Sequence, residues 1–132
     1  MSKSYVVEYE NSTRIDIPTT ATLLAIPEVG DAITGVIVWE GVTKSDLDHA
    51  LRYTQKGWPM SPRVTMRVVG RDGRVYFGTK PKALIGLQAS AVVAFKASSV
   101  SESKNGAVSY FKRPSKAREL GSLTEETGFL PA

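Results

Sequence analysis

Apolar side chains recur at every second position over most of this chain, and at helical spacing in one window only. Residues 63–68 alternate strictly, so Val64, Met66 and Val68 face one side of a strand and polar residues face the other. The segments between such runs are rich in turn-forming residues, as in a mostly β fold. Further strands are expected at residues 5–9, 14–17, 20–26, 33–39, 74–77, 91–100 and 108–112.

The window with helical spacing covers residues 44–56. Leu47 and Leu51 lie on one apolar stripe of this predicted helix. Thr43 followed by Asp46 is a typical N-terminal capping pair, and a glycine and a proline follow the last turn. The sequence therefore predicts one amphipathic helix at about 44–56, and we expect its stripe to pack on the sheet.

The chain has 132 residues, a length that favours one domain. Apolar periodicity stops after Pro114, which sets the predicted domain at residues 1–114. Residues 115–132 are then expected to form a flexible tail that is acidic at its end.

Charge is distributed very unevenly along the chain. The net charge is −3 over residues 1–62, +10 over residues 63–118 and −3 over residues 119–132. A segment this basic inside a chain of net charge +4 indicates a polyanionic partner, although a solvated β face would have the same composition.

The basic segment also contains aromatic residues. Cations that bind phosphates, mixed with rings on which bases stack, are what single-strand binding requires. Alternation places Tyr76 and Tyr110 on the solvent side and Phe77 and Phe111 in the core. Both tryptophans, Trp39 and Trp58, are expected in the core. The predicted nucleic-acid-binding residues are Arg63, Arg67, Arg71, Arg74, Tyr76, Lys80, Lys82, Lys96, Tyr110, Lys112, Arg113 and Lys116.

Catalytic and metal chemistry find little support in the sequence. There is no cysteine, and the single histidine, His49, has no second cluster of ligands with which to hold a metal. We therefore expect no enzyme activity and no cofactor. No apolar run is long enough for a membrane helix, and the N-terminus has no leader pattern, so a cytoplasmic protein is expected.

Two C-terminal segments resemble a known class of proteins. Residues 91–97, a polar turn and residues 110–117 are similar to the closing hairpin of OB-type barrels that bind single-stranded nucleic acid. This resemblance implies an OB-like barrel or a curled antiparallel sheet carrying the packed helix. The end of the chain resembles the partner-docking tails of bacterial single-stranded DNA-binding proteins. It implies a protein partner at Glu125, Glu126, Phe129 and Leu130.

The expected function is non-catalytic binding of single-stranded nucleic acid, DNA in preference to RNA, by a homo-oligomer. The alternative is a coat or decoration subunit of a virus or phage particle, whose basic face meets the genome or a neighbouring subunit. Small size and many short strands fit both, and the second would place the protein in a virion.

Overall fold

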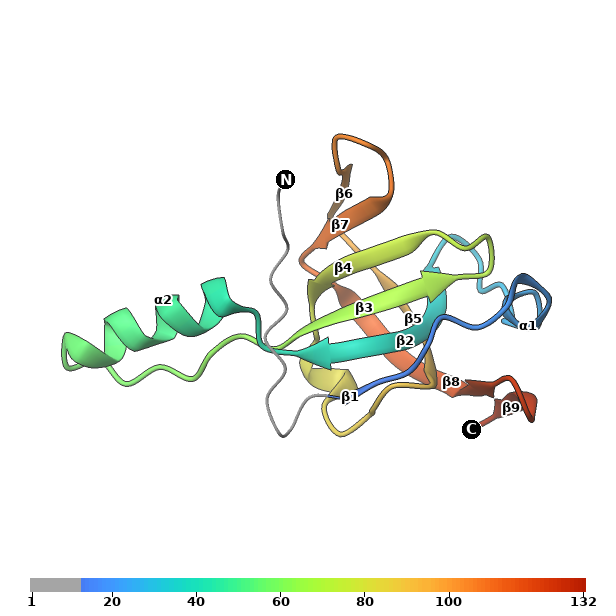
Figure 1. The fold of residues 1–132 in the computed structure, drawn as a ribbon, viewed down its shortest axis with the longest axis horizontal. Helices are drawn as coiled ribbons and strands as arrows, with labels where there is room; N and C mark the ends of the chain where they lie inside the picture. Colours follow the sequence, from blue (N-terminus) through green and yellow to red (C-terminus); the bar gives the residue numbers. More distant parts are fainter. Residues whose placement is uncertain (1–12) are drawn as a thin grey trace.

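The computed structural model describes residues 13–132, and the strand expected at residues 5–9 lies outside them. The described chain is mostly β, as predicted (Figure 1). Its elements are β1 (Thr13–Arg14), α1 (Thr20–Leu23), β2 (Ile33–Gly41), α2 (Lys44–Gln55), β3 (Thr65–Gly70), β4 (Val75–Thr79), the 3-10 turn η1 (Lys82–Leu84), β5 (Ala91–Lys96), β6 (Ser99–Glu102), β7 (Val108–Lys112), β8 (Ser115–Thr124) and β9 (Gly128–Pro131).

The strands form one mixed sheet in the order β6-β7-β4-β3-β2-β5-β8-β9, and β1 pairs with β2 beside β5. Every pairing is antiparallel except that of β4 with β7, which is parallel. The expectation of a purely antiparallel sheet is therefore wrong at this one ladder. Within the described residues no ladder joins β7 to β8, so the sheet is not closed into a barrel.

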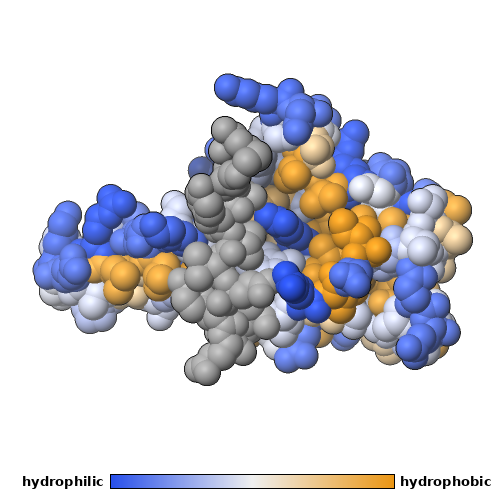
Figure 2. All heavy atoms as spheres, viewed as in Figure 1, coloured by the Kyte–Doolittle hydropathy of each residue, from blue (hydrophilic) through white to orange (hydrophobic). Residues whose placement is uncertain are grey.

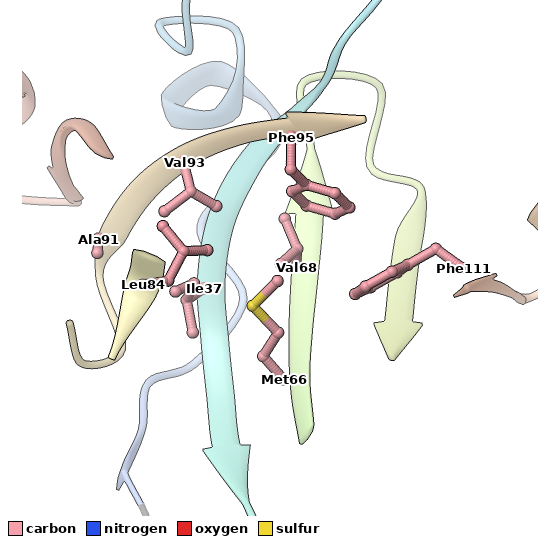
Figure 3. Packing of buried hydrophobic residues seen from close by; sticks show 8 residues of the cluster. All are labelled: Ile37, Met66, Val68, Leu84, Ala91, Val93, Phe95 and Phe111. Atoms are coloured by element: carbon pink, nitrogen blue, oxygen red, sulfur yellow. The ribbon is translucent and has the colours of Figure 1, made fainter. Parts of the chain in front are cut away.

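The inner face of the sheet is tightly curled around the main core. Phe95 of β5 and Phe111 of β7 come from strands well separated in the sheet, yet their ring centres are 4.7 Å apart. Met66 and Ile37 extend the core beside these rings, and Leu84 of η1 covers the end away from Phe111 (Figure 3). Phe111 is therefore in the core, as predicted.

The outer face holds a second core cluster, which is covered by the segment between β1 and β2. Val36, Val69 and Val92 pack there against Leu23 and Ile26, which belong to α1 and the turn after it. Residues of β2 are thus buried on both faces of the sheet, which explains its continuous apolar run.

Helix α2 has the predicted bounds to within one residue and the predicted cap. The hydroxyl of Thr43 accepts a hydrogen bond from the backbone N–H of Asp46 at 3.2 Å and donates one to its carboxylate at 2.8 Å. The expectation that α2 packs on the sheet is wrong, because the helix projects away from the end of β2 (Figure 1). Its central stripe residue, Leu51, is 48% exposed.

The apolar stripe of α2 instead faces the chain that returns from it. Residues 43–62, which we call the arm, double back so that Trp58 N–H bonds to the Tyr53 carbonyl at 3.0 Å. Their rings lie 6.2 Å apart, and Ala50 is buried beside this return segment. Trp58 remains 63% exposed, so its predicted core position is wrong. Figure 2 shows the resulting apolar band along the arm.

The segment predicted as a flexible tail is part of the sheet. Residues 115–124 form β8, which pairs with β5, and β9 folds back on β8. Leu123 is fully buried in the outer cluster, so the predicted boundary at residue 114 is wrong. The apolar side chains of β8 are spaced irregularly, because its ladder with β5 is interrupted by two register shifts.

The predicted strand at 91–100 is also two strands rather than one. The chain leaves β5 after Lys96 and crosses to β6 at the far edge of the sheet. There β6 pairs with β7, while β5 pairs with β8. The hairpin implied by the OB-type resemblance is therefore replaced by two separate pairings.

Candidate functional site

A row of aromatic and cationic residues crosses the outer face of the sheet. Residues paired across adjacent strands point to the same side. The pairings place five residues in one line, from β1 to β7: Arg14, Trp39, Arg67, Phe77 and Tyr110. We call these five residues the aromatic row.

A bulge in β2 sets the position of Trp39 in this row. The register between β2 and β3 shifts between Ile37 and Trp39, so Val38 has no partner of its own. Strict alternation would have placed Trp39 on the inner side with Ile37. The bulge turns it outward to lie opposite Arg67, as bulges near functional sites often do.

Arg67 lies against two rings. The Trp39 and Phe77 rings are nearly parallel, at 14°, with centres 6.4 Å apart. The guanidinium carbon of Arg67 is 5.9 Å from the Trp39 centre and 5.4 Å from the Phe77 centre, within cation–π range. Partial burial lowers the pKa of Arg67, which stays charged at any physiological pH because arginine is so basic.

Tyr110 ends the row and is its most accessible aromatic ring. Beyond it in the described sheet lies only Ser101 of the edge strand β6, and Tyr110 is 41% exposed. The ring meets Phe77 edge-on, with centres 6.1 Å apart and an angle of 83°. Lys112 lies two residues further along β7 on the same face and is also exposed. A planar ligand on Tyr110 would thus lie beside a cation.

The structure reverses the predicted positions of Tyr76 and Phe77. A two-residue Asp-Gly loop would pair Arg67 with residue 78 and put Tyr76 on the outer face. The observed loop has three residues between Gly70 and Arg74, whose backbones hydrogen-bond at 2.9 Å. That one extra residue places Phe77 opposite Arg67, while Tyr76 packs on the inner core.

Five of the predicted phosphate-binding cations have carboxylate partners within the chain. Most of these carboxylates come from the acidic N-terminal half, so the charge asymmetry of the sequence is partly cancelled in the fold. The pairs are Arg63–Asp46 at 3.2 Å, Arg71–Glu28 at 3.0 Å, Arg74–Glu102 at 3.8 Å, Lys80–Glu40 at 3.2 Å and Lys96–Asp31 at 3.3 Å. The pairs of Arg71, Arg74 and Lys96 are exposed enough to exchange at small cost, whereas the side chains of Asp46 and Glu40 are only 15% and 13% exposed.

Apart from Arg67, the remaining predicted cations are exposed and form no ion pair with the described residues. Lys82 lies in η1, and Lys112 ends β7. Arg113 and Lys116 follow at the corner between β7 and β8, both with left-handed backbone, at φ 53° and 52°. This corner is the basic patch nearest to Tyr110 along the chain.

Catalytic and metal centres are not evident in the part of the chain that the structure describes. His49 is exposed on the arm, with its ring 4.8 Å from the Tyr53 ring. Residues 13–132 contain no group of three histidine or carboxylate side chains placed to hold a metal ion. No helix among them is long and apolar enough to cross a membrane.

One of the four predicted partner-docking residues, Glu125, forms hydrogen bonds within the fold. The carboxylate of Glu125 accepts hydrogen bonds from the Thr22 hydroxyl, at 2.6 Å, and from the backbone N–H of Thr19. These bonds lower the pKa of Glu125 and tie the β8–β9 turn to the start of α1. Glu126 and Leu130 are exposed, whereas Phe129 packs partly on the outer core.

Comparison of the chain with protein-family models, curated proteins and solved structures finds no match.

The aromatic row was only partly foreseen from the sequence. Arg67 and Tyr110 were among the predicted residues, whereas Trp39 and Phe77 were assigned to the core. Trp39 is indeed buried, at 5% exposed, and Phe77 is partly buried. The Trp39–Phe77 contact depends on a bulge and a loop length that alternation alone does not reveal.

Proposed function

We propose that the protein binds single-stranded nucleic acid on the aromatic row, DNA in preference to RNA, without catalysis. The exposed ring of Tyr110, braced edge-on by Phe77 and followed by Lys112, is the observation that carries this proposal. A base stacks on such a ring only when its faces are free, which favours single strands over duplexes.

The basic residues that serve this function are fewer than the sequence suggested. Lys112 supplies charge beside Tyr110, and Arg113 and Lys116 follow it along the chain, all three without first breaking an ion pair with a described residue. Lys96 joins them if phosphate displaces the exposed carboxylate of Asp31, which costs little. Arg63 is held by Asp46, whose side chain is only 15% exposed. We therefore expect moderate affinity with few phosphate contacts.

An OB-like barrel remains our proposal for the finer fold class. The curl that brings Phe95 against Phe111 supports it. The missing ladder between β7 and β8 in the described residues weighs against it. A ligand face on the outside of a curled sheet agrees with either description.

A titration of labelled single-stranded DNA, single-stranded RNA and duplex DNA, followed by fluorescence anisotropy, tests the function. We expect the single strands to bind more tightly than the duplex, with an affinity that falls as salt rises. Equal affinity for duplex and single strand at every salt concentration would instead indicate nonspecific attraction to a polyanion.

A second candidate, a coat or decoration subunit of a virus or phage particle, is favoured by the arm. The arm extends from the domain (Figure 1), and its residues Leu51 and Trp58 are largely exposed. An isolated helix of this length is marginal in water, so a second copy of the chain is its expected support. Light scattering separates the two candidates, because large closed particles indicate a subunit and a small defined oligomer indicates a binder.

The two candidates differ in where the protein would act. A single-strand binder would act in the cytoplasm, and a particle subunit would end in the virion. Both are consistent with a homo-oligomer joined through the arm.

A further inference from the structure

A pocket of about 450 Å³ opens where β3 and β4 meet the loop after η1. Its apolar walls come from Val64, Ile85 and Leu87, whereas one carboxylate and three cations supply charge: Glu40, Arg63, Lys80 and Lys82. Its volume lies in the range of roughly 300–1,000 Å³ that is usual for small-ligand sites, and mostly apolar walls with few polar groups are typical of them.

The charged pair in this pocket is buried and fixed in place. The Lys80 side chain is 6% exposed and that of Glu40 is 13% exposed, with 3.2 Å between ammonium nitrogen and carboxylate oxygen. Lys80 also donates to the Leu87 carbonyl. Burying two charges is costly, and their pairing offsets part of this cost.

The side chains of Lys80 and Glu40 can each form further hydrogen bonds. Lys80 has three N–H donors, of which two are used within the described residues. The second carboxylate oxygen of Glu40 has no partner among them. The buried pair therefore presents one donor beside the second oxygen of Glu40, and Arg63 and Lys82 add further donors at the pocket wall.

We propose that this pocket receives one base of the bound strand and prefers guanine; the inference rests on the proposed single-strand binding. The Watson–Crick edge of guanine carries an acceptor, O6, next to two donors, N1–H and the N2 amino group. Lys80 would donate to O6 and Glu40 would accept from both donors. The other bases can form only two of these three hydrogen bonds.

The pocket lies within reach of the aromatic row. Thr79 lines it, and Thr79 lies two residues beyond Phe77 on the same strand. Arg63 also lines it and donates to the Thr79 hydroxyl at 3.0 Å. Two residues of a strand span about 7 Å, close to the spacing of extended nucleotides. Glu40 pairs with Met66 and therefore belongs to the inner side of the sheet, so a strand stacked on the row would pass over the end of β4 to place a neighbouring base here.

Thymine homopolymers carrying one central guanine, inosine or adenine test the preference. We expect the guanine strand to bind roughly fivefold to tenfold more tightly than the plain homopolymer, the effect of one further hydrogen bond. Inosine lacks the N2 amino group, so the strand that carries it should bind only slightly more tightly than the plain homopolymer. Equal affinity for all four strands, with binding that still depends on salt and on Tyr110, would overturn the guanine pocket and leave the proposed function standing.

Free guanosine monophosphate tests the pocket without a strand. We expect it to shift the amide resonances of Leu87 and Gln88 in the NMR spectrum, and E40Q to weaken this effect while E119Q, at an exposed position, does not. If E40Q fails to fold, I85A replaces it, because Ile85 is an exposed wall residue. Shifts with the nucleotide but no binding of any strand would keep the pocket and refute the function. No shift at these amides would refute the pocket.

Discussion

The guanidinium of Arg67 lies over the Phe77 ring of the neighbouring strand, 5.4 Å from its centre. This contact has two effects. It holds a positive charge at the middle of an otherwise apolar surface, and it fixes the ring against which Tyr110 packs. Arg67 is therefore a part of the aromatic row that orients other residues, and an alanine at this position should lower affinity partly by loosening Phe77.

Tyr110 and Tyr76 should differ sharply in a binding assay. We expect Y110A to weaken single-strand binding by about 1–3 kcal/mol through lost stacking, with little change in its salt dependence. Y76A should leave affinity unchanged in molecules that remain folded, because Tyr76 packs on the inner core. Anisotropy titrations of both variants check this, and a loss of affinity confined to Y76A would mean that the binding face is the other one.

Lys112 and Arg71 allow a controlled comparison of two basic residues. Lys112 forms no ion pair in the described chain, whereas Arg71 is bonded to Glu28. We expect K112A to make the slope of log affinity against log salt shallower by up to about 0.7, the share of one phosphate contact with a single strand. R71A should change the slope less. K112R is the control and should bind as the parent does. A larger slope change for R71A would move the phosphate path to the opposite end of β4.

Leu123 and Leu51 should have opposite effects on stability. We expect L123A to lower the free energy of unfolding by about 2–4 kcal/mol, because the side chain is fully buried in the outer cluster. L51A should change it by no more than about 0.5 kcal/mol, because the residue is largely exposed on the arm. Urea denaturation measures both at a protein concentration where the chain is monomeric. A large loss for L51A there would show that the arm folds onto the domain.

Glu125 should make stability depend on pH. Its pKa is lowered from 4.5 in the folded protein, chiefly by the hydrogen bond from Thr22. A depressed folded pKa stabilises the protein above the ordinary value, and this stabilisation is lost as pH falls through the lower, folded value. E125Q should therefore melt below the parent at neutral pH and match it in acid. E126Q is the control, and a melting difference that persists unchanged in acid would assign the effect to packing.

Features that depend on neighbours in the sequence were predicted well. The start of α2 follows from Thr43 and Asp46, which are three residues apart and need no other part of the chain. The turn after Gly70 was also found, because Asp-Gly accepts left-handed backbone locally, and Gly73 has φ 82°.

Features that depend on distant partners were not predictable in the same way. The β8 strand lies in the sheet because β5 offers an edge, and its own alternation is broken by register shifts. The ion pairs of Arg71 and Lys96 join residues far apart in the chain, so the basic segment looked freer than it is. Helix α2 shows the same limit, since its amphipathic stripe could not reveal whether a sheet or a short return segment would cover it.

The direct passage from β7 to β8 links the two sides of the curled sheet. These strands stand at opposite ends of the path β7-β4-β3-β2-β5-β8, yet only Arg113 and Pro114 separate them along the chain. Flattened, that path would be about 24 Å wide, and the short link can span only about 11 Å. The backbone at Arg113 and Pro114 therefore holds the two ends of the curled sheet together covalently. A single proteolytic cut between residues 112 and 115 would let the sheet unroll without breaking one of its ladders.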